Sequence, residues 1–187
     1  TGCDSIRSVA QQVLSFLTDL GIESFTLLGH SMGGMVVQQM AADAPKRIEK
    51  LICYGTGPVG ALPGRFETID ESRERLKQDG VPVTASRIAA TWFSKGDKAD
   101  AFAVCRELHS LTAWETWDGR AALSAIRCRT LVMWGDRDKS YDWDQPQALW
   151  RGISNSDLAV LPGCAHNAHL EKPVLFNAIL EDFVNGQ

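Results

Sequence analysis

Clusters of basic residues, paired cysteines and long apolar stretches are all missing from this chain of 187 residues. The net charge of -4 argues against nucleic-acid binding and against binding to an anionic membrane. No apolar run approaches the roughly 18 to 20 residues of a membrane span, and the N-terminal residues lack a signal-peptide pattern. With 44% hydrophobic residues, the sequence predicts one globular domain with a sizeable core and neither a membrane nor a nucleic-acid partner.

The cysteines are odd in number and have no regular spacing. There are five of them, and no two have the C-x-x-C spacing of a structural zinc site. This argues against a disulfide framework as well, because such frameworks use paired cysteines in small secreted proteins. A reducing compartment fits best, so we predict a cytoplasmic protein.

Helical and strand patterns alternate at both ends of the chain. The first part has predicted helices at 5–20 and 32–44 and predicted strands at 25–29 and 51–54. The last part has predicted helices at 146–151 and 173–184 and predicted strands at 130–134 and 158–161. Because the strands are short, continuous apolar runs, the alternation predicts an α/β fold: a mostly parallel sheet with flanking helices on both faces.

Residues 56–122 interrupt this alternation. Prolines and glycines separate helical candidates near 66–79, 83–94 and 98–117, which indicates an inserted helical cap. Tryptophans occur in this segment, and most of them are expected in the core of the cap. Trp92 and Trp114 are candidates to line an apolar substrate pocket.

A serine lies between the first predicted strand and the helix that follows it, within residues 29–34 (GHSMGG). Gly29 and Gly33 lack a Cβ, so the chain is expected to turn sharply around Ser31 and expose its hydroxyl. The helix that starts at Met32 points unpaired N–H groups at this position. Ser31 is therefore a candidate nucleophile, and the Met32 N–H is a candidate oxyanion donor.

A serine hydroxyl needs a base, and the base needs a carboxylate that orients it. Asp138 and His166 each follow a predicted strand, in the loops where α/β sheets carry their functional groups. Asp136 is the alternative acid. His169 is interpreted as structural or hydrogen-bonding. His30 is interpreted as a neighbour of the turn at Ser31 that contacts the substrate.

Three other motifs match known site patterns only weakly. Residues 55–60 match the dinucleotide fingerprint G-x-G-x-x-G, but Pro63 and Gly64 interrupt the helix that pyrophosphate binding requires. Residues 136–138 begin like a calcium loop without its glycine and glutamate. His166 and His169 lack the spacing of a zinc pair. We therefore expect neither a cofactor nor a metal.

Three segments together resemble the α/β-hydrolase fold: 29–34 (GHSMGG), 131–138 (LVMWGDRD) and 162–173 (PGCAHNAHLEKP). The resemblance spans nearly the whole chain and implies a catalytic triad of Ser31, Asp138 and His166, in the order known for these hydrolases. The family includes esterases, lactonases, C–C bond hydrolases of aromatic meta-cleavage products, haloperoxidases and hormone receptors. The motifs thus indicate the machinery and leave the substrate open.

The resemblance also implies a domain division and a missing part. It assigns 1–55 and 123–187 to the hydrolase core and 56–122 to the cap. Family members carry strands before the helix at 5–20, and a loop there supplies the second oxyanion N–H. The strand at 25–29 is therefore expected to be an edge, and the chain a fragment that is poorly active without a complementary N-terminal chain or segment.

We expect a serine hydrolase that cleaves a small carboxylic ester or related acyl compound through an acyl-enzyme. The alternatives are a C–C bond hydrolase of meta-cleavage products, a ligand-binding protein that keeps the triad, and a fragment without function.

Overall fold

The computed structural model describes residues 5–95 and 114–186. Its sheet contains four parallel strands, β1 (Phe25–His30), β2 (Ile48–Tyr54), β3 (Arg129–Gly135) and β4 (Ser156–Leu161), in the order β1-β2-β3-β4. The predicted α/β class with a parallel sheet is confirmed. β1 lies at one edge of this sheet, as expected, and β4 lies at the other.

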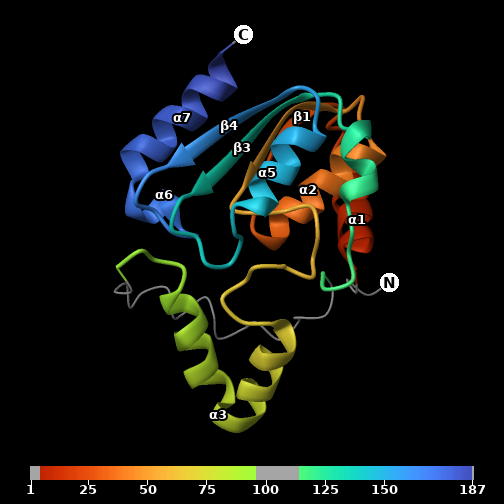
Figure 1. Ribbon diagram of the computed structural model, residues 1–187. Helices are drawn as coiled ribbons and strands as arrows, with labels where there is room; N and C mark the ends of the chain where they lie inside the picture. The colour runs from red at the N-terminus through yellow and green to blue at the C-terminus, as the bar shows by residue number, and fades with distance from the viewer. Residues whose placement is uncertain (1–4, 96–113, 187) are drawn as a thin grey trace.

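The sheet is covered on both faces (Figure 1). One face packs against α2 (Met32–Asp43) and α5 (Asp144–Gly152), and the other packs against α7 (Pro173–Asn185). α1 (Ile6–Asp19) packs on α2. Alternate residues of β2 serve the two faces: Leu51 and Cys53 lie in one apolar cluster, and Ile52 and Tyr54 in the other. Two buried faces explain why the strands read as continuous apolar runs.

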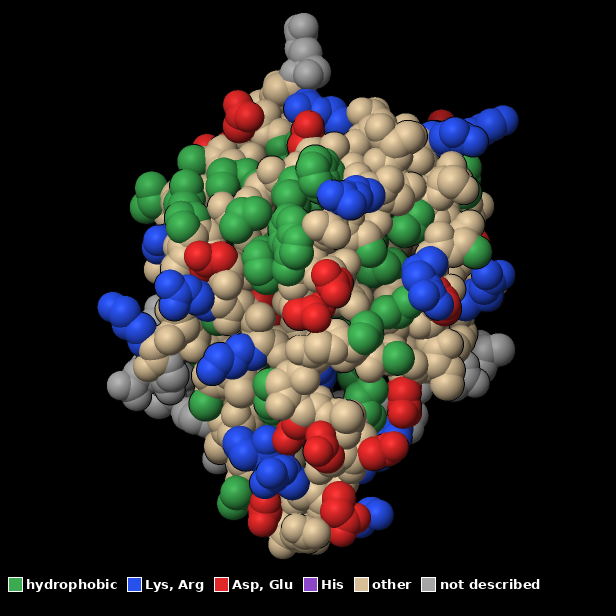
Figure 2. Space-filling view, viewed as in Figure 1, with side chains coloured by type: hydrophobic (Ala, Val, Ile, Leu, Met, Phe, Trp, Pro, Cys, Tyr) green, Lys and Arg blue, Asp and Glu red, His purple; other side chains and the backbone are tan. Residues whose placement is uncertain are grey.

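The inserted segment contains α3 (Ile69–Ala90), which extends away from the sheet beyond the carboxyl ends of the strands (Figure 1). Thr68 and Glu71 form a capping box that starts the helix, and Gly80, with φ of 76°, kinks it. The helices predicted at 66–79 and 83–94 are therefore confirmed as two helical parts of α3 that separate at Gly80, although the second part ends at Ala90. The surface around α3 is densely charged (Figure 2).

Part of the predicted cap lies outside the described residues. Of the third predicted helix, 98–117, only residues 114–117 are described. Residues 114–116 form a turn, and residue 117 has no regular structure, so these four residues are not helical. A 3-10 helix, η2 (Arg120–Ala125), then leads into β3. The division into 1–55, 56–122 and 123–187 stays a prediction.

Most element bounds differ from the predicted ones by one to three residues, because side-chain caps and tertiary contacts decide where helices start. The short helix α6 (Ala168–Glu171) was not predicted. Across residues 5–95 and 114–186, no helix is both long enough and apolar enough to cross a bilayer.

Candidate active site

Ser31 lies in a strained turn between β1 and α2. Its backbone has φ of 55° and ψ of -124°, a region that side-chain-bearing residues seldom adopt. A Cβ on Gly29 would lie 2.3 Å from the carbonyl oxygen of Gly33, so only glycine fits there. The expectation for Gly33 was wrong, since a Cβ at that position would meet nothing within 4 Å. Gly34 is the second restricted position: its Cβ would lie 2.4 Å from Thr56.

Backbone hydrogen bonds fasten this turn to the end of β2. The Ser31 N–H donates to the Tyr54 carbonyl at 3.0 Å, and the Thr56 hydroxyl donates to the Ser31 carbonyl at 2.7 Å. No side chain caps the first turn of α2 within the described residues. The Met32 N–H therefore remains among the unpaired donors that a helix presents at its start.

Asp138 and His166 are joined directly. The Nδ1 of His166 donates to Oδ2 of Asp138 at 2.8 Å, and both side chains are almost completely buried. Oδ1 of Asp138 accepts hydrogen bonds from the N–H groups of Ser140 and Tyr141, at 2.7 and 3.1 Å. With Nδ1 donating to the carboxylate, Nε2 is left as the acceptor that a general base needs. Asp136, the alternative acid, instead accepts from the Gly163 N–H at 2.5 Å.

Ser31 and His166 are neighbours through residues that touch both. The ring of His30, adjacent to Ser31, lies 4.4 Å from the ring of His166. The Tyr141 ring stacks on His166 at 5.6 Å and 15°, and Ser31 lies near enough to the Tyr141 hydroxyl to lower its pKa slightly against the larger effect of burial. No hydrogen bond joins the Ser31 hydroxyl to the His166 ring, and apo sites often close this contact only when substrate binds.

Three histidines and Tyr54 form a cluster behind the site, in which His166 and Tyr54 are buried and His30 and His169 are half-buried. His30 stacks on Tyr54 at 4.5 Å, and its Nε2 lies 3.0 Å from the His166 carbonyl. The Tyr54 hydroxyl donates to the same carbonyl at 2.9 Å, and it lies 3.1 Å from Nδ1 of His169. Burial, helped by the nearby His166, lowers the pKa of His30 to about 3, and the same two causes lower that of His169. At neutral pH both rings are therefore uncharged; the His30 ring contacts the His166 carbonyl, and the His169 ring contacts the Tyr54 hydroxyl.

Tyr141 was missed as a site residue by the sequence analysis. Its ring is fully buried, and burial raises the pKa of its hydroxyl, so the phenol keeps its proton at neutral pH. The one sequence signal is its place three residues after Asp138, in the loop that follows β3. The contacts with Ser31 and His166 come from other parts of the chain.

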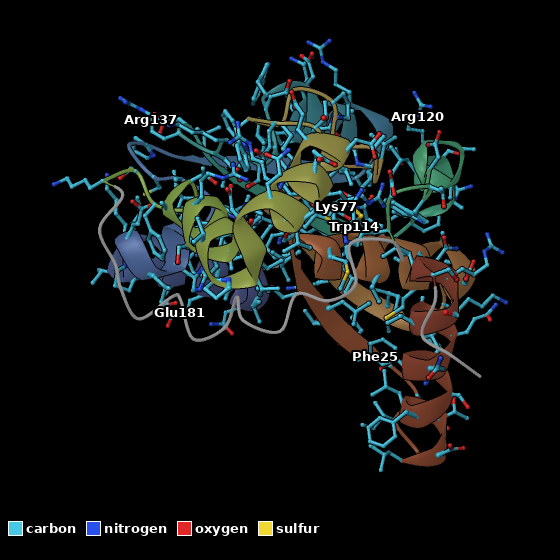
Figure 3. All side chains as sticks on the ribbon, turned by 90° about the horizontal axis from the view of Figure 1, so that it is seen from below. Phe25, Lys77, Trp114, Arg120, Arg137 and Glu181 are labelled. Atoms are coloured by element: carbon cyan, nitrogen blue, oxygen red, sulfur yellow. The ribbon has the colours of Figure 1, made fainter. Side chains whose placement is uncertain are left out.

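The residues predicted to bind substrate lie in different surroundings. The ring of Trp92 lies 5.9 Å from that of His166, so it borders the site. Trp114 packs against the apolar cluster over α1 and α2, and Figure 3 shows it near α2. His30 contacts His166 and Tyr54.

Residues 55–60, the dinucleotide-like segment, do not open a helix, since the next helix starts only at Ile69. Within the described residues, no group of three or more His, Cys, Asp or Glu side chains is placed to hold a metal ion.

Comparison with known proteins gives a consistent result. Residues 2–179 match the family described as "Alpha/beta hydrolase family". A 2-hydroxy-6-oxo-6-phenylhexa-2,4-dienoate hydrolase from Comamonas testosteroni is 30% identical over 196 residues, which cover 94% of this chain and 68% of that protein. An esterase from Exiguobacterium antarcticum has a similar fold, with a TM-score of 0.85 at 23% identity, covering 100% of this chain and 75% of the esterase. The enol-lactonase from Burkholderia xenovorans LB400 superposes with a TM-score of 0.81 at 22% identity, covering 99% of this chain and 75% of the lactonase.

Proposed function

The chain belongs to the alpha/beta hydrolase family, and we propose that it is a serine hydrolase that cleaves a small carboxylic ester or related acyl compound. Ser31 is the nucleophile, His166 the base and Asp138 the acid that orients it. The observation that carries the proposal is the buried 2.8 Å hydrogen bond between Asp138 and His166, beside a serine held at a positive φ of 55°.

The reaction follows from this arrangement. Nε2 of His166 takes the proton of Ser31 while Oγ of Ser31 attacks the carbonyl carbon, and Asp138 stabilises the imidazolium that forms. The Met32 N–H and the start of α2 stabilise the negative charge that develops on the carbonyl oxygen. His166 then gives its proton to the departing alcohol, which leaves an acyl group on Ser31. A water molecule, deprotonated by His166, releases the acid and restores the hydroxyl.

A second candidate is the cleavage of a C–C bond next to a ketone. The relative from Comamonas testosteroni carries a dienoate hydrolase name, and a dienoate hydrolase from Burkholderia cepacia is also 30% identical. In such a reaction the leaving group is a carbanion stabilised by conjugation, and it needs a proton where an ester releases an alcohol. The same serine, base and acid serve both reactions, so the substrate has to be tested directly.

The test compares the chain with its Ser31→Ala variant on p-nitrophenyl butyrate and on 2-hydroxy-6-oxo-6-phenylhexa-2,4-dienoate, together with labelling by a fluorophosphonate. We expect covalent labelling of Ser31, many turnovers of the ester per labelled site, and loss of both in the variant. A strong preference for the dienoate selects the second candidate, and labelling without turnover indicates a ligand-binding protein. Hydrolysis by Ser31→Ala at the wild-type rate rejects the serine mechanism.

A further inference from the structure

Two segments far apart in the chain meet beside His166. We call residues 91–94 the α3 exit turn and residues 162–167 the histidine loop. The N–H of Asn167 donates to the carbonyl of Trp92 at 3.0 Å. This bond brings the Trp92 ring to 5.9 Å from the ring of His166, so the inserted segment forms one wall beside the candidate base.

The carboxylate of Glu171, in α6, joins the same two segments. Its Oε1 accepts hydrogen bonds from the backbone N–H of Ser94, at 2.7 Å, and from the Ser94 hydroxyl. Its Oε2 accepts from the N–H of Ala165 at 2.6 Å, one residue before His166. Each oxygen therefore serves one segment, and the contact to Ser94 spans 77 residues of sequence.

A carboxyl side chain suits this pattern because both of its oxygens accept hydrogen bonds, and the N–H groups of Ser94 and Ala165 can only donate. An amide at position 171 has one acceptor oxygen and would turn an NH₂ group towards the N–H of either Ser94 or Ala165. Short hydrogen bonds to a charged acceptor are also about twice as strong as neutral ones. The carbonyl side of His166 is held separately by the Tyr54 hydroxyl, at 2.9 Å. Hydrogen bonds therefore hold the backbone on both sides of the His166 side chain, at the Ala165 N–H and at the His166 carbonyl.

We propose that Glu171 is a positioning residue that couples the inserted segment to the base: its carboxylate locks the α3 exit turn onto the histidine loop and thereby sets both the His166 backbone and the distance of Trp92 from its ring. The catalytic part of this inference rests on the proposed role of His166. The inserted segment then moves together with the base, so a displacement of α3 is transmitted to His166 through this carboxylate in addition to the hydrogen bond between Asn167 and Trp92.

The test is Glu171→Gln, with Glu181→Gln as the matched control. Glu181 is an exposed residue of α7, away from the site (Figure 3). Two readouts are used: the rate of fluorophosphonate labelling of Ser31 together with kcat and KM for p-nitrophenyl butyrate, and the NMR contact between the Trp92 indole and the Hε1 proton of His166. For Glu171→Gln we expect kcat and the labelling rate to fall about tenfold to a hundredfold, as misplacement of a catalytic group commonly causes. KM should change little and the Trp92 to His166 contact should weaken, while the control stays at the wild-type values.

Ser94→Ala provides a milder variant in case Glu171→Gln fails to fold. It removes one of the three donors and keeps the bond to Ala165, so the same readouts should change in the same direction by about twofold to fivefold. Its effect should also be non-additive with that of Glu171→Gln, since the two residues share one interaction. If either folded variant loses thermal stability while the NMR contact and kcat stay unchanged, the coupling is rejected. The NMR contact does not depend on the reaction, so it separates failure of the coupling from failure of the proposed serine mechanism.

Discussion

The carboxylate of Asp138 has a partner for each oxygen. Oδ2 is bound by His166, and Oδ1 by the backbone N–H groups of Ser140 and Tyr141. Two rigid backbone donors hold the carboxyl group, so its other oxygen is directed at Nδ1 of the histidine. Through this contact Asp138 selects the ring tautomer in which Nε2 can accept a proton.

Replacing Asp138 by Asn should therefore abolish most activity without unfolding the protein. The amide of Asp138→Asn can turn its NH₂ towards Nδ1 of His166, which places the ring proton on Nε2 and removes the base. We expect kcat for p-nitrophenyl butyrate to fall by about 10³- to 10⁴-fold, with the far-ultraviolet circular dichroism spectrum unchanged. Asp136→Asn is the control, because Asp136 binds the Gly163 N–H instead. A larger loss in Asp136→Asn than in Asp138→Asn would reverse the assignment of the acid.

Residues of the candidate site differ in how far the sequence predicts them. Ser31, Asp138 and His166 each follow a strand, and a strand end can be recognised locally from an apolar run and the glycines around it. Tyr141 contacts Ser31, which lies 110 positions earlier in the chain. Glu171 contacts Ser94, which lies 77 positions earlier. No local pattern encodes such contacts, so they become visible only in the folded chain.

At the scale of single elements, the start of α2 depends on how closely it approaches the loop after β2. Gly34 faces Thr56 at a distance that leaves no room for a methyl group, whereas Gly33 faces open space. Both lie in the first turn of the same helix, so their intrinsic preferences are similar. The two glycines therefore separate the effect of packing from the effect of helix propensity.

Gly34→Ala should destabilise the protein, and Gly33→Ala should not. The new methyl group in Gly34→Ala would push Thr56 away and disturb its bond to the Ser31 carbonyl, which costs about 1–3 kcal/mol. Gly33→Ala should gain up to about 1 kcal/mol from the better helix propensity of alanine. Urea denaturation followed by circular dichroism measures both. Equal free energies of unfolding in the two variants would show that the close approach to Thr56 is unimportant.

Sequence patterns predicted the order and type of the described strands and of most long helices, because β2 and β3 are buried on both faces and α1 and α7 each pack one apolar side against the rest of the fold. The predicted bounds of helices and strands were less accurate where tertiary contacts decide at which residue an element begins or ends. The four-residue α6 has too few positions for a helical period, whereas Gly80 and Pro82 correctly indicated the break inside α3. The wrong expectation for Gly33 has the same origin, since only coordinates show which glycine meets a neighbour.

At the scale of the whole molecule, the half-buried His30 links stability to pH. Burial and the nearby His166 lower its pKa from 6.5 to about 3 in the folded chain. The unfolded chain therefore binds a proton more readily between these values. The stabilisation is fully present above pH 6.5 and is lost as the pH falls towards 3.

The prediction is measured by urea denaturation at a series of pH values from 7 to 4, comparing the protein with His30→Gln. Below pH 6.5, His30 alone should lower the free energy of unfolding by roughly 1.4 kcal/mol per pH unit. His30→Gln lacks the titrating ring, so its stability should fall less steeply over the same range. An identical pH slope in both proteins would mean that His30 keeps its ordinary pKa in the folded state.

The four strands stand side by side in the order in which they occur in the chain. During synthesis the ribosome therefore releases Ser31 first, the strand before Asp138 later, and His166 last. If Ser31 and His166 act together as proposed, neither is effective before the other is in place, because a serine without its base is a weak nucleophile. β4, the last strand to be made, would then complete the site by placing the histidine loop beside the serine.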